Sequence, residues 1–423
     1  MSEDPITLQG ESKHGRSHLW FISEIYYPDE TSTGFVVTRL AEAAACNRAV
    51  KVLCGLPRYD RRGSSVARSE TRNRVRIRRC HGTTFSKDSL FGRILNTVTI
   101  TLSIATRAMW EIRSTDTVVV ATNPPILPFL ISLIARARGA RTLLLIHDVF
   151  PEALIAAGMI RPTSPSARIL ARLGAWLYQE VDAIAVCGRD MADIVSARAG
   201  VPAPLLGLVR NWADIELIAP ADRRDNHLLR GLGLGDRFVV QYAGNMGPVH
   251  DIPMIVDAAV ALQHTHPEVH FLFIGSGSRL PRLRSEISRR ELKNITILGP
   301  QPRDAQASFL NACDVAITAF VPGMYGAGVP SRMYNVMAAG KPWIAAVDAA
   351  SEIGLVIQEE NAGWVVAPRD TPNLIAAIVA AFERPDRLEE MGRRARHAVQ
   401  DKYTFAVTCR SLEQLLAEIE TVR

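Results

Sequence analysis

Short apolar runs alternate with amphipathic segments along most of the chain, and this alternation predicts strands separated by helices. The runs 50–55, 116–125 and 182–188 predict strands in the first half, and the runs 238–248 and 314–320 predict strands in the second. Because strands that alternate with helices form parallel sheets, the sequence predicts an α/β protein with two Rossmann-like, doubly wound domains that face a central cleft.

The alternation is interrupted near the middle of the chain, and this interruption sets the predicted domain boundaries. A chain of 423 residues has room for two domains of about 200 residues each. The start is polar and lacks the apolar core of a signal peptide, so we predict a disordered tail there. The predicted parts are a tail over 1–17, an N-terminal domain over 18–207, a linker over 208–220, a C-terminal domain over 221–402, and a helix over 403–423 that returns to the N-terminal domain.

A long amphipathic helix is predicted over 88–113, after a polar segment at 58–75 and an edge strand at 76–80. Two interpretations of this helix remain open: it touches a membrane surface, or it packs its apolar stripe on its own sheet. The stripe consists of Leu90, Phe91, Ile94, Leu95, Val98 and Leu102.

Glycine loops follow strand ends in the second half, at Gly244–Gly247, Gly275–Gly277 and Gly326–Gly328. In a parallel sheet such loops lie at one edge, where ligands bind. The third loop leads into a predicted helix with Ser331 as N-cap, and Arg332 and Asn335 share a face of that helix. Backbone N–H groups and a guanidinium suit a phosphate, although a glycine loop before a helix is also an ordinary connection.

The first half carries polar residues at comparable positions. His147, Asp148 and Glu152 lie at the carboxyl end of the apolar run 142–154, which is predicted as a strand, although a lone histidine is often structural. Gly34 lies where the first loop meets a helix. The G-x-G-x-x-G fingerprint is missing there, so a dinucleotide site is disfavoured.

Composition narrows the class of protein. The chain is 48% hydrophobic and 22% charged, as ordinary soluble globular proteins are. The six cysteines are scattered without a CxxC pair, which predicts reduced thiols in a cytoplasmic compartment and neither a zinc site nor disulfides. The most apolar segment, 118–135, is interrupted by polar and proline residues, so no bilayer span is predicted. No Asp-any-Asp triplet occurs, so a chelated Mg²⁺ or Mn²⁺ ion is not expected. No cofactor is predicted either.

Positive charge is concentrated between Lys51 and Arg107, where 13 basic and 3 acidic residues give a net charge of +10. This excess predicts an anionic partner, such as lipid head groups, a diphosphate-linked substrate or nucleic acid, or else a solvated basic face. The sequence contains no RNA- or DNA-binding motif, so nucleic acid is not expected among the partners.

Motifs along nearly the whole chain resemble those of family-4 GT-B glycosyltransferases. The closest resemblance is to the bacterial branch that builds polysaccharides of the colanic-acid and O-antigen type. The motifs are YYPDETSTG (26–34), LLLIHDVFPEAL (143–154), VRNWAD (209–214), YAGNMG (242–247), FLFIGSGS (271–278), NITILGPQP (294–302) and VPSRMYNVMAAGKPWIA (329–345).

The resemblance implies a role for each residue that matches a family motif. The C-terminal half would hold a nucleotide-sugar, with Arg332 on its diphosphate. Ala327 and Asn335 stand where most members carry two glutamates, and Pro248, Val249 and His250 replace a basic residue of the family. The implied catalytic residues are His147, Asp148 and Arg332; the implied donor contacts are Gly34, Gly244, Asn245, Gly247, Gly275, Gly277, Pro300, Ser331, Arg332, Asn335 and Glu352; the implied acceptor-side residues are Glu152 and Asn211.

The resemblance also implies an activity. The enzyme would move a sugar from a UDP-sugar to a polyprenyl-diphosphate-linked or other saccharide acceptor, with retention of anomeric configuration. Arg332 would stabilise the leaving group and a donor phosphate oxygen would take the acceptor proton. The expected location is cytoplasmic and peripheral at the inner membrane. The missing glutamates keep two alternatives open: a nucleotide-sugar epimerase of the same architecture, or a non-catalytic nucleotide-sugar-binding subunit.

Overall fold

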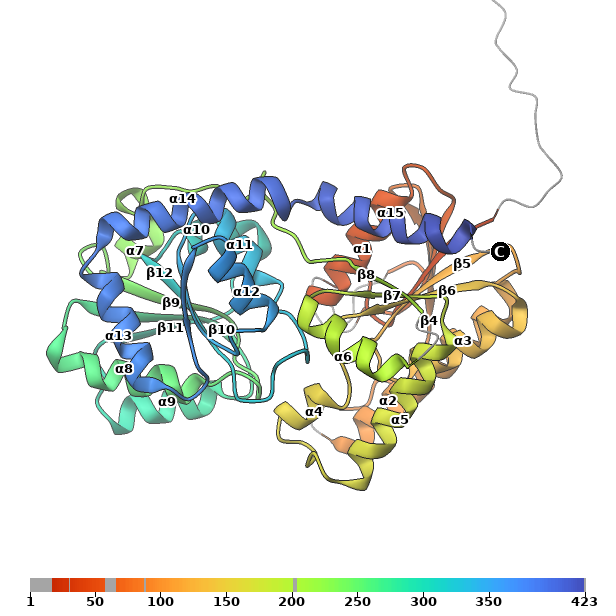
Figure 1. Ribbon diagram of the computed structural model, residues 1–423, viewed down its shortest axis with the longest axis horizontal. Helices are drawn as coiled ribbons and strands as arrows, with labels where there is room; N and C mark the ends of the chain where they lie inside the picture. Colours follow the sequence, from red (N-terminus) through yellow and green to blue (C-terminus); the bar gives the residue numbers. More distant parts are fainter. Residues whose placement is uncertain (1–16, 30, 58–65, 87–88, 201–203, 422–423) are drawn as a thin grey trace, which may run out of the picture. The chain divides into compact units, whose positions relative to one another are not determined.

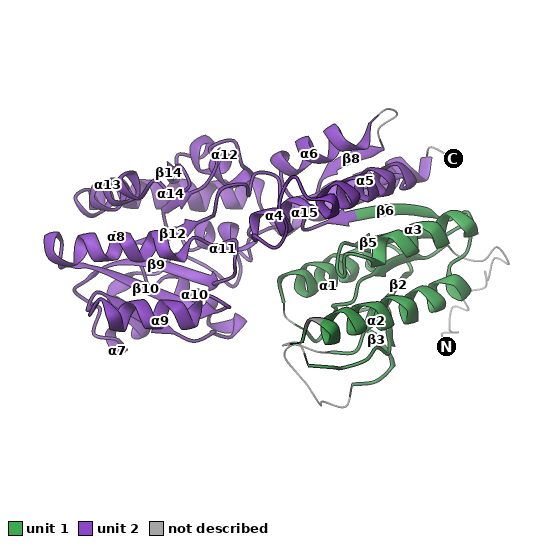
Figure 2. Ribbon diagram, turned by 90° about the horizontal axis from the view of Figure 1, so that it is seen from below, with its two compact units in different colours: residues 1–144 green, residues 145–423 purple. Residues whose placement is uncertain are grey.

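The computed structural model of the protein describes residues 17–29, 31–57, 66–86, 89–200 and 204–421. Almost all of the predicted tail lies outside these residues, as do 58–65, Lys87 and Asp88 of the predicted basic region. The chain forms two compact units, residues 1–144 and 145–423, and the boundary between them falls inside a strand (Figure 2).

The first unit is built on parallel strands with helices packed against them (Figure 2). Leu19 pairs with Val50 on one side and with Thr117 on the other. The central strands are buried along their whole length, because helices cover both faces of a parallel sheet, and they therefore read as continuous apolar runs. The elements are β1 (Leu19–Ile22), α1 (Ser32–Ala44), β2 (Val50–Gly55), β3 (Ser69–Arg72), β4 (Val75–Cys80), α2 (Leu90–Glu111), β5 (Thr117–Ala121), α3 (Leu127–Arg138) and β6 (Arg141–Ile146), whose last two residues belong to the second unit.

A hairpin corrects two of the sequence predictions. The polar segment 58–75 contains β3, which pairs antiparallel with β4, so β4 is not an edge strand. Asn73 and Arg74 make the turn with φ of 46° and 66°, a conformation that asparagine adopts readily and arginine rarely. β3 is polar because its residues alternate between exposed and partly buried positions, and this pattern hid it in the sequence.

The second unit contains the remaining elements. The predicted strand 142–154 ends at Ile146, because the apolar residues beyond it belong to a loop in which Val149 is fully buried. The elements are α4 (Glu152–Ala156), α5 (Pro165–Glu180), β7 (Ala183–Val186), α6 (Arg189–Ala199), β8 (Leu205–Leu208), η1 (Arg223–Asp225), α7 (His227–Gly231), β9 (Phe238–Asn245), α8 (Ile252–Thr265), β10 (Val269–Ser276), α9 (Leu280–Arg289), β11 (Ile295–Leu298), η2 (Arg303–Ala305), α10 (Gln306–Leu310), β12 (Val315–Ala319), α11 (Arg332–Ala338), β13 (Trp343–Ala346), α12 (Glu352–Glu359), β14 (Gly363–Val366), α13 (Thr371–Phe382), α14 (Pro385–Lys402) and α15 (Phe405–Thr421).

Among the described residues, the strands form two sheets. The first has the order β3-β4-β2-β1-β5-β6-β7-β8, and the second has the order β11-β10-β9-β12-β13-β14. All pairs of the second sheet are parallel. Its two faces are covered by separate apolar clusters, with Val239 in one and Val240 in the other, because successive strand residues point to opposite faces. The predicted α/β fold class is confirmed.

Two segments that cross between β8 and the second sheet are bound to each other. Ala213 N donates a hydrogen bond to Tyr403 O at 3.0 Å, and the rings of Trp212 and Phe405 lie 4.7 Å apart. After this crossing α15 packs against β7 and β8, whereas α14 packs against α11 and α13 (Figure 1). The first crossing lies in the predicted linker, 208–220.

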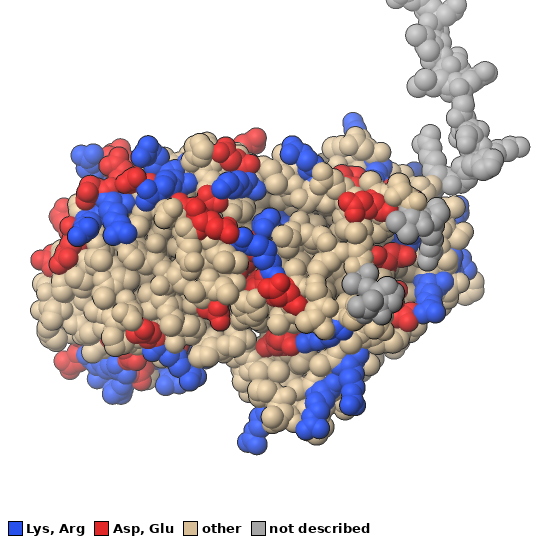
Figure 3. All heavy atoms as spheres, in the orientation of Figure 1, with Lys and Arg blue, Asp and Glu red and all other residues tan. Residues whose placement is uncertain are grey.

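In the described part of the chain, no helix combines the length and the apolar character that a bilayer span requires. On the face shown in Figure 3, acidic and basic side chains are intermixed around α14. The second unit therefore carries no extended patch of one charge sign over that part of its surface.

Candidate active site

Two glycine loops lie side by side at the carboxyl edge of the second sheet. Gly275 of β10 pairs with Gly244 of β9, and Met246 N donates a hydrogen bond to Ser276 O at 2.7 Å. Gly275 has a φ of 138°, and a Cβ there would overlap Gly244 O. Glycine is required because the two backbones approach more closely than any side chain permits. The predicted convergence of these two loops at one edge is confirmed.

Arg332 lies against these loops. It is the first residue of α11, and its Nη1 donates a hydrogen bond to Ala243 O at 2.7 Å. A Cβ on Gly244 would overlap the Arg332 guanidinium, so the cation lies directly on the glycine backbone. A guanidinium stays charged at neutral pH. The residue is also solvent-exposed, so a fixed cation is open to a ligand at this edge.

The start of α11 differs from its prediction. Ser331 holds the N-cap position in a right-handed helical conformation, with φ −61° and ψ −22°, and its side chain makes no capping hydrogen bond. The predicted side-chain cap is therefore wrong. Asn335 Oδ1 accepts a hydrogen bond from Asp214 N at 3.3 Å, so its amide oxygen faces the crossing segment, whereas Arg332 reaches β9.

The third glycine loop is joined to the residues that follow β6. Val149 N donates a hydrogen bond to Ala327 O at 2.9 Å, and Asp148 and Gly328 form an isolated antiparallel bridge. Gly326 N donates to Asp190 Oδ2 at 3.1 Å. Ala327 is completely buried by its surroundings. A glutamate, which the resemblance places at this position, would therefore be buried in this chain.

These contacts bring His147 and Asp148 to the third loop. Burial lowers the pKa of His147 to about 4, so its imidazole is neutral near pH 7. Its Nδ1 lies 3.7 Å from Cys187 Sγ. Loss of solvent around the carboxyl raises the pKa of Asp148. A neutral imidazole donates and accepts hydrogen bonds, which suits the orientation of hydroxyl groups better than the transfer of a proton from a charged acid.

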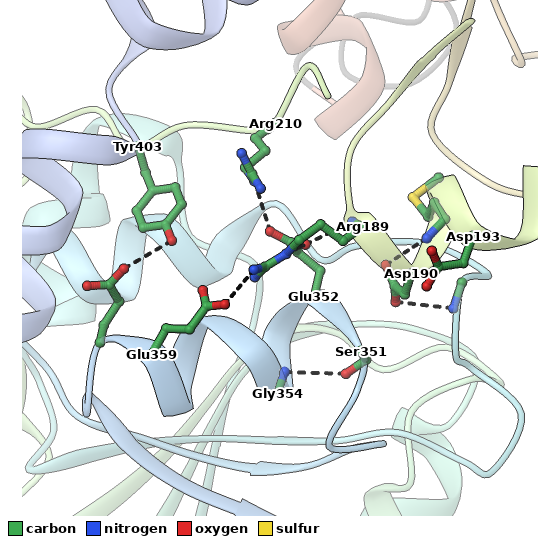
Figure 4. Close-up of polar contacts among 12 residues, drawn as sticks. Arg189, Asp190, Asp193, Arg210, Ser351, Glu352, Gly354, Glu359 and Tyr403 are labelled. Carbon is green, nitrogen blue, oxygen red and sulfur yellow. Dashed lines mark hydrogen bonds and ion pairs between the residues drawn. The ribbon is translucent and has the colours of Figure 1, made fainter. Parts of the chain in front are cut away.

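A buried ion-pair cluster joins α6 to α12 (Figure 4). Glu352 Oε2 accepts hydrogen bonds from Arg189 N at 2.9 Å and from Arg189 Nε at 2.8 Å, and Glu352 Oε1 accepts one from Arg210 Nε at 2.9 Å. Arg189 Nη1 also donates to Glu359 Oε1 at 2.5 Å. Burial acts to raise the pKa of Glu352, but the hydrogen bonds and charges of the two arginines outweigh it, so the net pKa is lowered.

This cluster changes the interpretation of Glu352, which the sequence predicted as a donor contact. Its side chain is fully buried, and both carboxylate oxygens are engaged. Glu352 also lies in the lining of the cavity between the third loop and α12, but its two ion pairs already occupy part of its acceptor capacity. In this structure Glu352 instead links α12 to α6. Helix α6 in turn contacts the third glycine loop, since Asp190 Oδ2 accepts a hydrogen bond from Gly326 N and Asp193 Oδ2 accepts one from Tyr325 Oη at 2.7 Å.

Other predicted site residues are dispersed. Glu152 is the first residue of α4 and pairs with Arg198, and Asn211 is only 5% exposed. Pro300 is exposed in the loop after β11, beside β10 in the sheet order. Gly34 lies in the first turn of α1, in the first unit, where a Cβ would meet Asp29 O at 2.6 Å. The donor and acceptor roles of these residues stay predictions.

The sequence reasoning missed Arg189, Asp190 and Arg210. Arg189 and Arg210 are separated from Glu352 by 163 and 142 positions, so no local pattern joins them. A cavity of about 230 Å³ lies between the third loop and α12, and its lining includes Gly328, Asp348 and Ser351. Over the described ranges, no three His, Cys, Asp or Glu side chains are grouped in a way that could hold a metal ion.

The fold and this edge define a class of protein. Two Rossmann-like folds on parallel sheets, with a cation over glycine loops at the strand ends of the second, are typical of GT-B glycosyltransferases. Two family models match the chain: "Glycosyl transferase 4-like domain" over residues 33–212 and "Glycosyl transferases group 1" over residues 230–398.

Known proteins give the same result. The probable glycosyltransferase WbjE of Pseudomonas aeruginosa is 30% identical over 332 residues, covering 78% of this chain and 81% of that protein. The putative colanic acid biosynthesis glycosyl transferase WcaI of Escherichia coli (strain K12) is 26% identical over 261 residues, 60% of this chain and 63% of its own. HepE of Anabaena, solved with UDP-glucose, has a TM-score of 0.72 at 14% identity, over 95% of this chain and 99% of its own. The chain therefore belongs to the family-4 GT-B glycosyltransferases, and the predicted family and enzyme class are confirmed.

Proposed function

We propose that this glycosyltransferase moves a sugar from a UDP-sugar to a lipid-linked saccharide, with retention of anomeric configuration, during assembly of a bacterial surface polysaccharide. The observation that carries the proposal is the Arg332 guanidinium against Gly244, at the edge where β9 and β10 end. An exposed cation beside glycine backbone matches the charge and the hydrogen-bonding needs of a diphosphate.

The donor assignment has support from the site and from a structural relative. HepE, which has this fold, was solved in complex with UDP and with UDP-glucose. A diphosphate beside Arg332 would lie next to Asn245, Gly247 and Gly277, and the base would reach the loop that carries Pro300, because β11 neighbours β10. These contacts follow the family pattern and remain part of the proposal.

The proposed chemistry uses the donor itself as the base. The bond between the anomeric carbon and the diphosphate oxygen breaks while the acceptor oxygen bonds to the same face of that carbon, and the acceptor proton passes to a donor phosphate oxygen. Arg332 stabilises the charge on the departing diphosphate. His147, which is neutral near pH 7, orients the donor sugar, and Asp148 hydrogen-bonds the acceptor.

The acceptor and the location are supported by the relatives and by charge. The name of WcaI refers to colanic acid biosynthesis, which is a polysaccharide pathway. The net charge of +10 between Lys51 and Arg107 matches a polyprenyl diphosphate or the surface of an anionic membrane. We therefore propose a cytoplasmic enzyme that is peripheral at the inner membrane.

Calorimetric titration of the full chain with UDP and with GDP tests the donor site. We expect UDP to bind and to raise the melting temperature, since a ligand of the folded state stabilises that state. We expect Arg332→Gln to weaken UDP binding about tenfold to a hundredfold, because a hydrogen bond to a charged group contributes roughly 1.5–3 kcal/mol. Arg282→Gln, an exposed position on α9, is the matched control and should bind as the unchanged chain does.

The donor-site proposal fails if neither nucleotide binds, or if Arg332→Gln binds UDP with unchanged affinity. Product analysis with UDP-sugars and lipid-linked saccharides then separates the alternatives. A transferase extends the acceptor, whereas an epimerase changes the sugar without one. A non-catalytic subunit would bind UDP and form no product.

A further inference from the structure

Helix α2 presents an apolar stripe to solvent. The stripe consists of Phe91, Ile94, Val98, Leu102 and Met109, which recur at helical spacing along one face. Phe91 is 74% exposed, and Ile94 and Leu102 are 54% and 53% exposed. Clusters of large exposed apolar side chains of this kind mark interaction surfaces, because water does not favour them.

The core-facing side of α2 is made by other residues. Asn96, Ile100, Ile104 and Ala108 are buried, and Asn96 Oδ1 accepts hydrogen bonds from Thr83 Oγ1 and from Phe85 N at 2.9 Å each. These four residues are spaced by four and face the sheet. Of the stripe that the sequence left open between a membrane and its own sheet, Phe91, Ile94, Val98 and Leu102 therefore point away from the sheet, and Leu95 is partly buried. α3 packs beside α2 (Figure 2), and its Leu133 is also exposed.

A basic groove runs along the flank of the same helix. It has a volume of about 680 Å³, and its arginines, Arg68, Arg78, Arg79 and Arg107, are accompanied by no carboxylate among the lining residues. Arg78 and Arg107 share the single carboxylate of Glu111, and Arg79 pairs with Glu70. Arg68 and Arg107 are exposed, so the groove presents cationic groups to an anion.

Trp110 connects the stripe to the groove. It is 80% exposed, lines the groove, and follows Met109 of the stripe directly in α2. Tryptophan is favoured where an apolar layer meets a polar one, because its ring is apolar and its indole N–H is a donor. An apolar stripe, an interfacial tryptophan and flanking arginines together form the pattern of a helix that lies in a bilayer interface.

We propose that the stripe and the groove of α2 dock this enzyme on an anionic phospholipid bilayer, with the stripe among the acyl chains and the groove on phosphate head groups. A second copy of the chain fits this surface poorly, because a symmetric contact would bring arginines against arginines. The inference rests on the proposed membrane-facing function, and it assigns that contact to specific residues of the first unit.

Flotation of the full chain with lipid vesicles tests the surface. We expect binding to vesicles of phosphatidylcholine mixed with phosphatidylglycerol, and weaker binding to phosphatidylcholine alone. We expect Phe91→Ser with Leu102→Ser to lower partitioning by at least about tenfold, because the bilayer no longer buries their apolar area. Met159→Ser with Leu217→Ser is the matched control, since both residues are exposed and apolar but lie in the second unit.

Two double variants that each remove two positive charges test the groove separately. We expect Arg68→Gln with Arg107→Gln to lower partitioning roughly 25-fold at low salt, at about fivefold for each arginine near an anionic surface. Arg282→Gln with Arg284→Gln removes the same charge from exposed positions of α9 and should leave partitioning unchanged. Circular dichroism confirms that each variant is folded.

The inference is overturned if the folded wild-type chain does not float with anionic vesicles, or if the α2 variants float as well as their controls. Sedimentation that shows a dimer, lost in the Phe91→Ser/Leu102→Ser variant, would assign the stripe to a second copy instead. UDP titration of the same variants keeps the two proposals separate. Vesicle binding without UDP binding would refute the donor site alone, and UDP binding without vesicle binding would refute the docking surface alone.

Discussion

Removing the charge of Glu352 provides a sharp test of the ion-pair cluster. Glu352→Gln keeps the size of the side chain and leaves Arg189 and Arg210 facing a neutral amide. The amide nitrogen is a donor and cannot accept from either arginine, so at least one guanidinium loses its hydrogen bond to residue 352. The cluster joins α6 to α12, and we therefore expect the second unit to lose stability.

The magnitude follows from burial. Removal of one partner from a buried ion pair costs about 3–5 kcal/mol. The side chains of Arg189 and Arg210 are 31% and 30% exposed, so water partly replaces the lost acceptor. We therefore expect a loss of about 2–3 kcal/mol, which is roughly a 30- to 150-fold change in the unfolding equilibrium. Because the arginines lower the pKa of Glu352, its contribution is fully present above the ordinary glutamate pKa and is lost as the pH falls through the lowered value.

Urea unfolding measures this loss within the second unit when it is monitored by hydrogen exchange in peptides 183–199 and 343–366. Glu359→Gln is the matched control, because Glu359 also pairs with Arg189 but is 47% exposed, and an exposed pair contributes less than about 1 kcal/mol. If Glu352→Gln destabilises these peptides no more than Glu359→Gln does, the cluster does not hold the two helices together and the reasoning is wrong.

Other predictions follow from the same edge of the sheet. Gly244→Ala should displace Arg332 and weaken UDP binding at least about tenfold. Gly231→Ala is the control, because a Cβ there meets open space, and it should leave UDP binding unchanged. Equal affinities of the two variants by calorimetry would contradict this prediction. Ala327→Glu should lower the melting temperature and add no activity, because the position is fully buried. His147 and His250 have pKa values lowered to about 4, so the unfolded chain takes up protons first and stability should fall between pH 6.5 and 4; a urea midpoint that stays constant over this range would refute it.

The fold was largely readable from the sequence because its signals are local. Apolar runs such as 314–320 predicted strands, and the order of strands and helices predicted parallel sheets. The meeting of Gly244 with Gly275 was also predictable, since the carboxyl ends of neighbouring parallel strands share an edge. β3 was missed because a polar, half-exposed strand lacks an apolar run.

The candidate site was less predictable, because its contacts join distant residues. The stripe of α2 was visible in the sequence, but periodicity gives only which residues share a face, and the sheet-facing side includes polar Asn96. Glu352 follows a strand as a ligand-binding residue does, yet arginines more than a hundred positions away bury it. Arg332 was identified by motif, and its contact with Gly244 supports the predicted location, while its role in catalysis stays a prediction.

The paired crossings at Ala213 and Tyr403 have a mechanical consequence. Two segments that are joined by a hydrogen bond and by the tilted ring contact of Trp212 with Phe405 behave as a single ribbon with two backbones. Such a ribbon bends easily across its thin direction, but it resists torsion and sliding, because both would shear the bonds between its backbones. A proteolytic nick in either backbone therefore leaves the other as a tether between β8 and the second sheet.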